Sequence, residues 1–140
     1  MTDPGNRFTA RVADIMSAPP ITIDVGARAY RAVGLLRKHG IRHLPVLRRG
    51  ALVGVVSERD LLPRQEPVGE VMAGDPLDVE VGALMCSTPV VVTPEDSIHG
   101  AVQRMLERRI GGLPVVEAGS DTVVGMVTYV DVLRTLPSPQ

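Results

Sequence analysis

Aromatic side chains are scarce in this sequence, which contains two Tyr, one Phe and no Trp among its 140 residues. Proteins that hold single-stranded DNA or RNA stack the bases on aromatic rings. So few rings exclude a base-stacking surface. They also require a core built from Val, Leu, Ile, Met and Ala.

Net charge is almost absent as well: the formal charge is -1 and the sequence pI is about 6.3. No overall positive field exists to attract nucleic acid or anionic lipid. No apolar run is long enough to span a bilayer, and the N-terminus lacks the apolar core of a signal peptide. We therefore expect a soluble, cytoplasmic protein that binds neither nucleic acid nor membrane.

Cysteine occurs once, as Cys86. An internal disulfide and a multi-thiolate zinc site are therefore excluded, and a single thiol suits a reducing compartment. His39, His43 and His99 have no partner at the spacing of metal ligands, so no metal site is expected. Phosphate-binding glycine motifs are missing, and Ser57 and Cys86 have no recognisable base in sequence. No catalytic residues are predicted, and the protein is not expected to be an enzyme.

The sequence does contain an internal repeat, which is the first feature to seek in any chain. Residues 12–48 match residues 81–117, and after a short insertion at 118–122 the match continues to the end of the repeat. The predicted organisation is an N-terminal segment (1–11), repeat 1 (12–62), a Pro- and Gly-containing acidic linker (63–80), repeat 2 (81–135) and a C-terminal tail (136–140).

Each repeat predicts the order β-α-β-β-α. Short apolar runs at 21–23 and 90–92 are typical of buried strands. Apolar residues at helical spacing follow in both copies: Ala29, Ala32, Val33 and Leu36, then Ile98, Ala101, Val102 and Met105. Two hairpins (44–56 and 113–127) and short helices beginning at Glu58 and Tyr129 complete the repeats. The fold class is α/β (α+β), with two small sheets.

The helix ends carry their own signals. Thr93, followed by Pro94, is the predicted N-cap of the second long helix, and Asp24 is the corresponding candidate in the first. Gly40 is suited to a left-handed C-cap, a position that Arg109 holds in repeat 2.

The repeated motifs resemble tandem CBS domains. They are V-x-D-x-M-x-x-x-P from Val12, I-x-x-L-P-V from Ile41 and Ile110, and G-x-V-[ST]-x-x-D from Gly54 and Gly125. The resemblance implies two units packed pseudo-symmetrically, with clefts between the repeats that bind adenosine nucleotides in many relatives. It also implies a disc-like homodimer.

Two Ser/Thr-x-x-Asp motifs are the best chemical candidates: Ser57 with Asp60, and Thr128 with Asp131. One interpretation is a helix capping box. The other is a ligand site, in which the amides and hydroxyl of a helix start bind phosphate and the carboxylate accepts from ribose hydroxyls. The resemblance places ribose and phosphate contacts at these positions. A glycine three residues earlier permits close approach to the backbone.

Arg42 and His43 form a basic pair where relatives place charge against a ligand phosphate, and surface salt bridging is the alternative. Repeat 2 has two glycines there, so one cleft should be the better phosphate site. Backbone groups at Thr22 and Val91 are candidates for the adenine edge. The adenine ring would lie in a slot of aliphatic side chains: Ile21, Ile23, Val90, Val92 and Met126. The alternative is that these residues are ordinary core residues of the strands.

The predicted function is a regulatory module that binds an adenosine-containing ligand: AMP, ADP, ATP, S-adenosylmethionine or NAD. No cofactor is obligatory. The expected partners are this ligand, a second copy of the chain and an unidentified regulated protein. The alternative is a structural or partner-binding CBS dimer whose clefts are empty.

Overall fold

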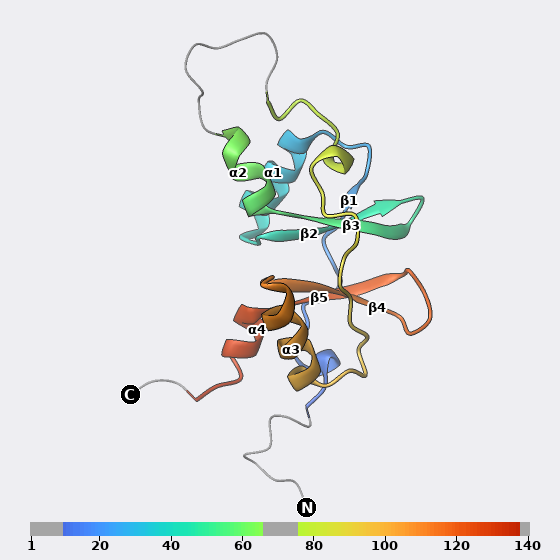
Figure 1. Cartoon of the computed structure of the whole chain (residues 1–140), viewed down its shortest axis with the longest axis vertical. Helices are drawn as coiled ribbons and strands as arrows, with labels where there is room; N and C mark the ends of the chain where they lie inside the picture. The colour runs from blue at the N-terminus through green and yellow to red at the C-terminus, as the bar shows by residue number, and fades with distance from the viewer. Residues whose placement is uncertain (1–9, 66–75, 138–140) are drawn as a thin grey trace, which may run out of the picture. The chain divides into compact units, whose positions relative to one another are not determined.

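The computed structural model describes residues 10–65 and 76–137 (Figure 1). They form two compact units. One comprises residues 21–89 and is called the 21–89 unit. The other joins residues 1–20 to residues 90–140 and is called the 1–20/90–140 unit.

The 21–89 unit contains a three-stranded sheet in the order β1-β2-β3, with β1 parallel to β2 and β2 antiparallel to β3. Its elements are β1 (Ile23–Asp24), α1 (Ala29–His39), β2 (His43–Arg48), β3 (Ala51–Ser57), α2 (Glu58–Gln65) and the 3-10 helix η3 (Val81–Ala83). Helix α2 extends three residues into the segment predicted as linker, most of which lies outside the described residues.

The 1–20/90–140 unit repeats this arrangement with a two-stranded antiparallel sheet. Its elements are the 3-10 helix η2 (Val12–Asp14), α3 (Ile98–Arg108), β4 (Gly112–Val116), β5 (Val123–Thr128) and α4 (Tyr129–Leu133). A single parallel bridge between Val92 and Val115 stands where the other unit has β1. The predicted mixed α/β class with small sheets is confirmed.

The C-terminal ends of the long helices follow the prediction, but their N-terminal ends do not. Gly40 ends α1 in the left-handed conformation, at φ 62°, and Arg109 ends α3 in the same way at φ 54°. The predicted N-cap Thr93 was wrong: Ser97 caps α3, accepting a hydrogen bond from the Gly100 amide at 2.9 Å. Thr93 instead begins a turn, in which its amide donates to Asp96.

Asp24 is likewise not a helix cap. Its carboxylate accepts from the Gly26 amide at 2.9 Å, and α1 begins five residues later, after Arg28. Arg28 supplies no side-chain cap; instead, the first two amides of α1, those of Ala29 and Tyr30, donate to the carbonyls of Val79 and Leu77 at 2.7 and 3.1 Å.

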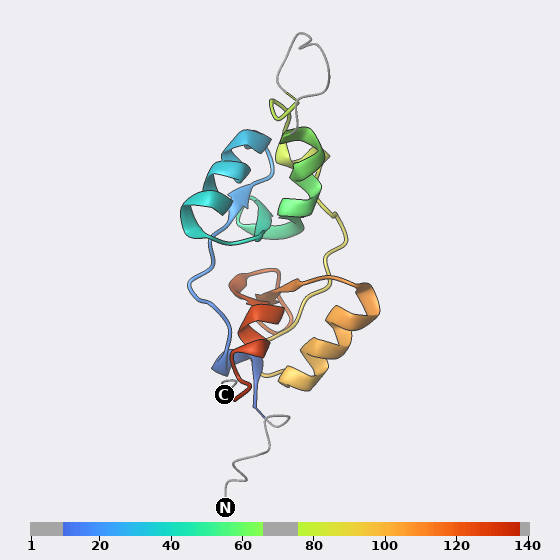
Figure 2. The ribbon, with the colours of Figure 1, turned by 90° about the vertical axis from the view of Figure 1, so that its left-hand side faces the viewer.

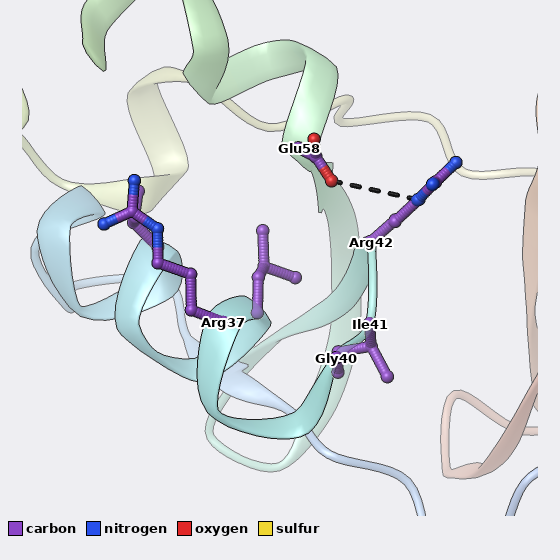
Figure 3. Close-up of a pocket in the computed structure, with 7 residues that line it drawn as sticks. Arg37, Gly40, Ile41, Arg42 and Glu58 are labelled. Carbon is purple, nitrogen blue, oxygen red and sulfur yellow. Dashed lines mark ion pairs between the residues drawn. The ribbon is translucent and has the colours of Figure 1, made fainter.

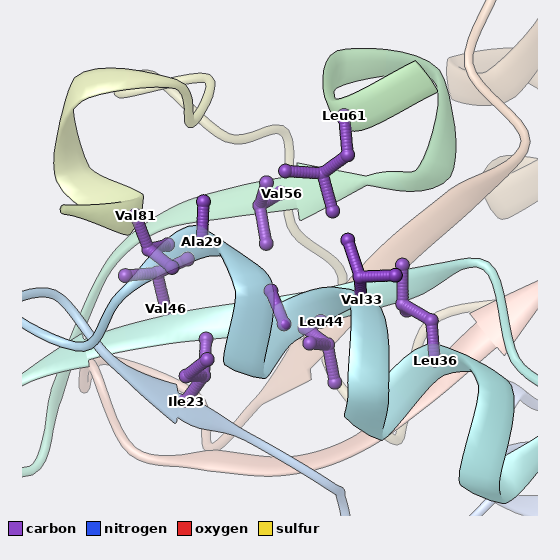
Figure 4. Close-up of a cluster of buried hydrophobic side chains, with 10 residues drawn as sticks. Ile23, Ala29, Val33, Leu36, Leu44, Val46, Val56, Leu61 and Val81 are labelled. Atoms are coloured by element: carbon purple, nitrogen blue, oxygen red, sulfur yellow. The ribbon is translucent and has the colours of Figure 1, made fainter. Parts of the chain in front are cut away.

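The core of the 21–89 unit lies between its sheet and its helices (Figure 4). Helices α1 and α2 lie side by side (Figure 2), and α1 buries the predicted stripe. The fully buried side chains of this core include Leu44, Val46, Val56, Leu61 and Val81. All are aliphatic, as the shortage of aromatic residues requires.

Each unit borrows a short segment from the other sequence repeat. Val81 opens repeat 2, yet it is fully buried in the core of the 21–89 unit, and its amide donates to the Ala27 carbonyl at 2.8 Å. Val12 opens repeat 1, yet it is fully buried in the core of the 1–20/90–140 unit, and its amide donates to the Asp96 carbonyl at 2.8 Å. The compact units are therefore not the sequence repeats.

The motif glycines make room for these borrowed segments. A Cβ built on Gly54 would lie 2.5 Å from Met85 Sδ and 2.6 Å from the Cys86 carbonyl oxygen. One built on Gly125 would lie 2.8 Å from the Ser17 carbonyl oxygen. The close approach expected at these glycines is thus made by the protein's own chain.

Candidate functional site

Five of the predicted site residues belong to the 21–89 unit, and most gather at one end of its sheet. His43 opens β2 and pairs with Ser57, the last residue of β3. Asp60 follows in the first turn of α2. Because β1 runs parallel to β2, Thr22 enters the sheet from the same end. Arg42 is tied to this end because its carbonyl accepts from the Glu58 amide at 2.8 Å.

Ser57 and Asp60 form a complete capping box. The Ser57 amide donates to Asp60 Oδ2 at 2.8 Å, and the Asp60 amide donates to Ser57 Oγ at 3.3 Å. The Ser57 hydroxyl also lies 3.0 Å from Asp60 Oδ2 and donates to it. All these bonds use one carboxylate oxygen, and within the described residues Asp60 Oδ1 has no partner. The capping and ligand-binding interpretations therefore need different oxygens and are compatible.

The helix start offers less to a phosphate than the sequence suggested. The amides of Ser57, Glu58 and Asp60 are each already bonded within the unit. The Ser57 hydroxyl proton is directed at Asp60, so the oxygen remains as an acceptor only. The start of α2 therefore presents mainly hydrogen-bond acceptors, which suit the hydroxyl donors of a ribose better than phosphate oxygens.

The basic pair divides into two unlike residues. Arg42 is exposed, and its Nε lies 3.9 Å from Glu58 Oε2, so the salt-bridge alternative is present in the fold. His43 is partly buried. Burial lowers its pKa below the ordinary value of 6.5, Arg42 lowers it further, and the carboxylates of Asp60 and Glu58 oppose both. At neutral pH His43 is therefore uncharged in this environment.

Beside this pair, a cavity of about 410 Å³ opens between the end of α1 and the start of α2 (Figure 3). Its lining combines apolar side chains with the charged residues Arg37, Arg42 and Glu58. The lining residues are Val33, Leu36, Arg37, Gly40, Ile41, Arg42 and Glu58. The sequence analysis missed Glu58 and placed no function on Arg37. The position of Glu58, next to Ser57, was the only available signal.

The 1–20/90–140 unit contains the second motif in the same geometry. The Thr128 amide donates to Asp131 Oδ2 at 2.8 Å, and the hydroxyl lies 3.2 Å from the same oxygen. Thr128 pairs with Gly112, which stands where the other unit has His43. Tyr129 occupies the place of Glu58. Apart from the capping box, the polar side chains at this end of the sheet in the 21–89 unit are therefore missing from the equivalent end in the 1–20/90–140 unit.

Val91 has a partner that the sequence did not predict. Its carbonyl accepts a hydrogen bond of 2.6 Å from Arg104, which also lies 3.5 Å from Asp96. The proposed adenine slot residues belong to the two cores. Ile23, Val92 and Met126 are buried, and Ile21 and Val90 pack against the same clusters.

Residues 10–65 and 76–137 contain no group of three or more His, Cys, Asp or Glu side chains placed to hold a metal ion. No helix within this part of the chain has both the length and the apolar character needed to cross a membrane.

The family model for the CBS domain matches residues 12–66 and 81–138. The chain belongs to the CBS-domain family. It carries two copies of the domain, as the motifs indicated. A relative of similar size, CBS domain-containing protein YhcV from Bacillus subtilis, is 29% identical over 129 residues, which cover 86% of this chain and 81% of YhcV.

Longer relatives carry such a pair as one part. Three curated proteins of 29–30% identity match over most of this chain, which spans only 14% to 22% of their length.

Solved structures of CBS pairs have the same fold. The CBS domain pair of protein MJ0100, in complex with 5'-methylthioadenosine and S-adenosyl-L-methionine, matches with a TM-score of 0.77 and 27% identity, covering 91% of this chain and 95% of the other. CBSX2 in complex with AMP matches with a TM-score of 0.77 and 28% identity, covering 90% and 95%.

Proposed function

We propose that this CBS pair is a regulatory module that binds an adenosine-containing ligand and is not itself an enzyme. The observation that carries the proposal is the open carboxylate oxygen of Asp60. The capping box fixes this carboxylate through Oδ2, so Oδ1 is held in place without a partner among the described residues. A pre-positioned acceptor of this kind suits the paired hydroxyls of a ribose.

The ligands of the two solved neighbours support the ribose as the recognised group. AMP, 5'-methylthioadenosine and S-adenosyl-L-methionine differ in their 5' substituents but share adenine and ribose. We propose the corresponding contacts for this chain. Asp60 and Ser57 hold the ribose, Thr22 contacts the base edge through its backbone, and Arg42 and His43 lie near the 5' substituent. Thr128, Asp131 and Val91 are the corresponding candidates in the other unit.

Regulation requires that the ligand prefer one of two arrangements of the protein. We propose that the module acts on a regulated protein through such a preference. The exposed thiol of Cys86 fits a reducing compartment such as the cytoplasm.

A homodimer is the proposed assembly, and a specific surface supports it. Helices α3 and α4 contact each other, and these helices and the residues just after them carry exposed apolar side chains, here called the α3–α4 apolar face: Leu106, Ile110, Tyr129, Val130, Leu133 and Leu136. Leu106 is 68% exposed and Leu133 is 55% exposed, which is a large apolar surface to leave in water. The corresponding positions in repeat 1 include Arg37, Glu58 and Arg59. A region that is more apolar in one repeat than in the other fits self-association through the apolar one. The same face supports the alternative function, a structural dimer with empty ligand sites.

A thermal-shift panel with AMP, ADP, ATP, S-adenosylmethionine and NAD tests the proposal, because binding to the native state raises Tm. The informative variant is Asp60→Asn. Its amide oxygen can still accept the Ser57 amide, while its NH2 group replaces the open acceptor. We expect at least one ligand to raise the Tm of the wild type, and Asp60→Asn to lose that shift while keeping the unliganded Tm.

Asp14→Asn is the matched control, because Asp14 Oδ2 accepts the Arg11 amide at 2.8 Å in a similar local box in the other unit. It should keep the ligand-induced shift. Absence of a shift with every ligand at millimolar concentration would favour the structural dimer instead.

A further inference from the structure

The ligand-binding end of the 21–89 unit has few groups left for phosphate. Three amides at the start of α2 are already bonded, and the Ser57 hydroxyl proton is directed at Asp60. A phosphate at this end would therefore depend on side-chain cations.

The nearest of those cations already has an anion beside it. Arg42 Nε lies 3.9 Å from Glu58 Oε2, and the two residues are also joined by the backbone hydrogen bond from the Glu58 amide to the Arg42 carbonyl. Glu58 is therefore held beside Arg42 by the fold as well as by charge. Figure 3 shows the Glu58 carboxylate directed at Arg42.

The other charged side chains near Glu58 do not supply a large excess of positive charge. Arg37 also lines this cavity, from α1, so the cavity lining includes two basic residues and one acidic residue. Asp60 adds a second carboxylate close to His43, and the partly buried imidazole is neutral at pH 7. With the exposed Arg59 included, the cluster has only a small excess of positive charge, which the several negative charges of a triphosphate would exceed.

We propose that Glu58 is a specificity residue, an internal anion on Arg42 that makes this site select adenosine ligands with one phosphate or none over triphosphates. The inference rests on the proposed function and refines its ligand class. In repeat 2 the place of Glu58 is taken by Tyr129, and Arg42 is replaced by Gly111. This selection against triphosphates, here called the charge filter, is therefore proposed for the 21–89 unit and not for the other unit.

The test is calorimetric titration of the full chain with adenosine, AMP and ATP, which share base and ribose and differ in phosphate number. The wild type should bind adenosine and AMP more tightly than ATP. Glu58→Gln removes the internal anion while keeping side-chain size. It should strengthen ATP binding by roughly three- to tenfold, as for a partly exposed charge pair that acts on several ligand charges. Adenosine binding should stay unchanged.

Glu117→Gln is the matched control, because it removes an exposed carboxylate from the other unit and changes the net charge equally. It should leave all three affinities unchanged. The sodium chloride dependence of ATP binding should become steeper in Glu58→Gln but not in Glu117→Gln, since Arg42 would attract phosphate more strongly without the Glu58 carboxylate beside it.

The outcomes separate the two proposals. If the wild type binds ATP more tightly than AMP and adenosine, or if Glu58→Gln shifts all three affinities equally, the charge filter is wrong and the adenosine site stands. If none of the three ligands binds the wild type or Glu58→Gln, both the site and its filter are refuted.

Discussion

Val55 and Cys86 exchange two backbone hydrogen bonds, at 3.0 and 2.8 Å, across an isolated antiparallel bridge. Met126 and Ser17 repeat this exchange in the other unit, at 3.0 and 2.8 Å. In each case a hairpin strand of one sequence repeat is paired with the opening segment of the other. The pairing explains why a glycine precedes Val55 and Met126, and it leads to the first two predictions.

Gly54→Ala should destabilise the protein by about 1–3 kcal/mol, the usual cost of overpacking a tight site. Its Cβ would meet Met85 Sδ and the Cys86 carbonyl, and the carbonyl cannot move without disturbing the bridge. Gly34→Ala is the control: it lies within α1 with open space around it, so it should stabilise by roughly 0.5–1 kcal/mol. Urea unfolding measures both. Equal effects of the two substitutions would contradict the close approach.

Val12→Ala should destabilise the 1–20/90–140 unit, which holds most of repeat 2, although Val12 lies at the start of repeat 1. The residue is fully buried against Val92 and Leu113, so its truncation should cost about 2 kcal/mol. Hydrogen exchange should show lost protection in β4 and β5 more than in β2 and β3. Val81→Ala should give the reverse pattern. Loss confined to β2 and β3 in Val12→Ala would refute the segment exchange.

Acidification should weaken the fold through His43. Its pKa in the folded protein is lowered by burial and by Arg42, against the opposing carboxylates of Asp60 and Glu58. A group with a lowered native pKa binds its proton more readily when unfolded, so stability rises with pH across this range. The contribution of His43 is fully present above pH 6.5 and is lost as the pH falls from there through the lowered pKa.

Melting temperatures of the wild type and His43→Gln between pH 8 and pH 5 test this. We expect the variant to lose less of its Tm on acidification, because its side chain does not titrate. Parallel curves for the two proteins would show that His43 does not contribute.

Leu106→Arg and Val130→Arg should weaken self-association, because they place charge in the α3–α4 apolar face. Each substitution introduces the residue that repeat 1 has at the equivalent position, Arg37 in α1 and Arg59 in α2. Arginine is therefore compatible with a helix at both positions. Sedimentation velocity should show a dimer for the wild type and a shift toward monomer for the variants. Ala118→Arg, in an exposed turn of the same unit, should remain dimeric. A monomeric wild type would refute the proposed assembly.

The sequence could predict those elements whose causes are local. The hairpins, the left-handed turn at Gly40 and the capping box at Ser57 depend on neighbouring residues. Local chemistry was ambiguous at Thr93, where a Thr-Pro helix start competes with a turn that Asp96 closes. Four residues later, Ser97 supplied a cap of similar strength, and packing of Ile98 into its unit selected it.

The exchanged segments and the state of Asp60 depend on causes beyond local sequence. Val12 and Val81 are the same residue in equivalent positions, so nothing in their neighbourhoods says which core each enters. Periodicity identified the repeat without revealing this exchange. The sequence also treats the Asp60 carboxylate as one group, whereas the fold gives its two oxygens different roles.

The borrowed segments mean that the chain passes between the two units twice, near Pro20 and near Pro89. Cutting the polypeptide between residues 65 and 76 would therefore not release two domains. Each fragment would retain one hairpin and would also hold the segment that completes the other fragment's core. We expect the nicked protein to stay associated and to unfold as a bimolecular complex, with a Tm that depends on its concentration.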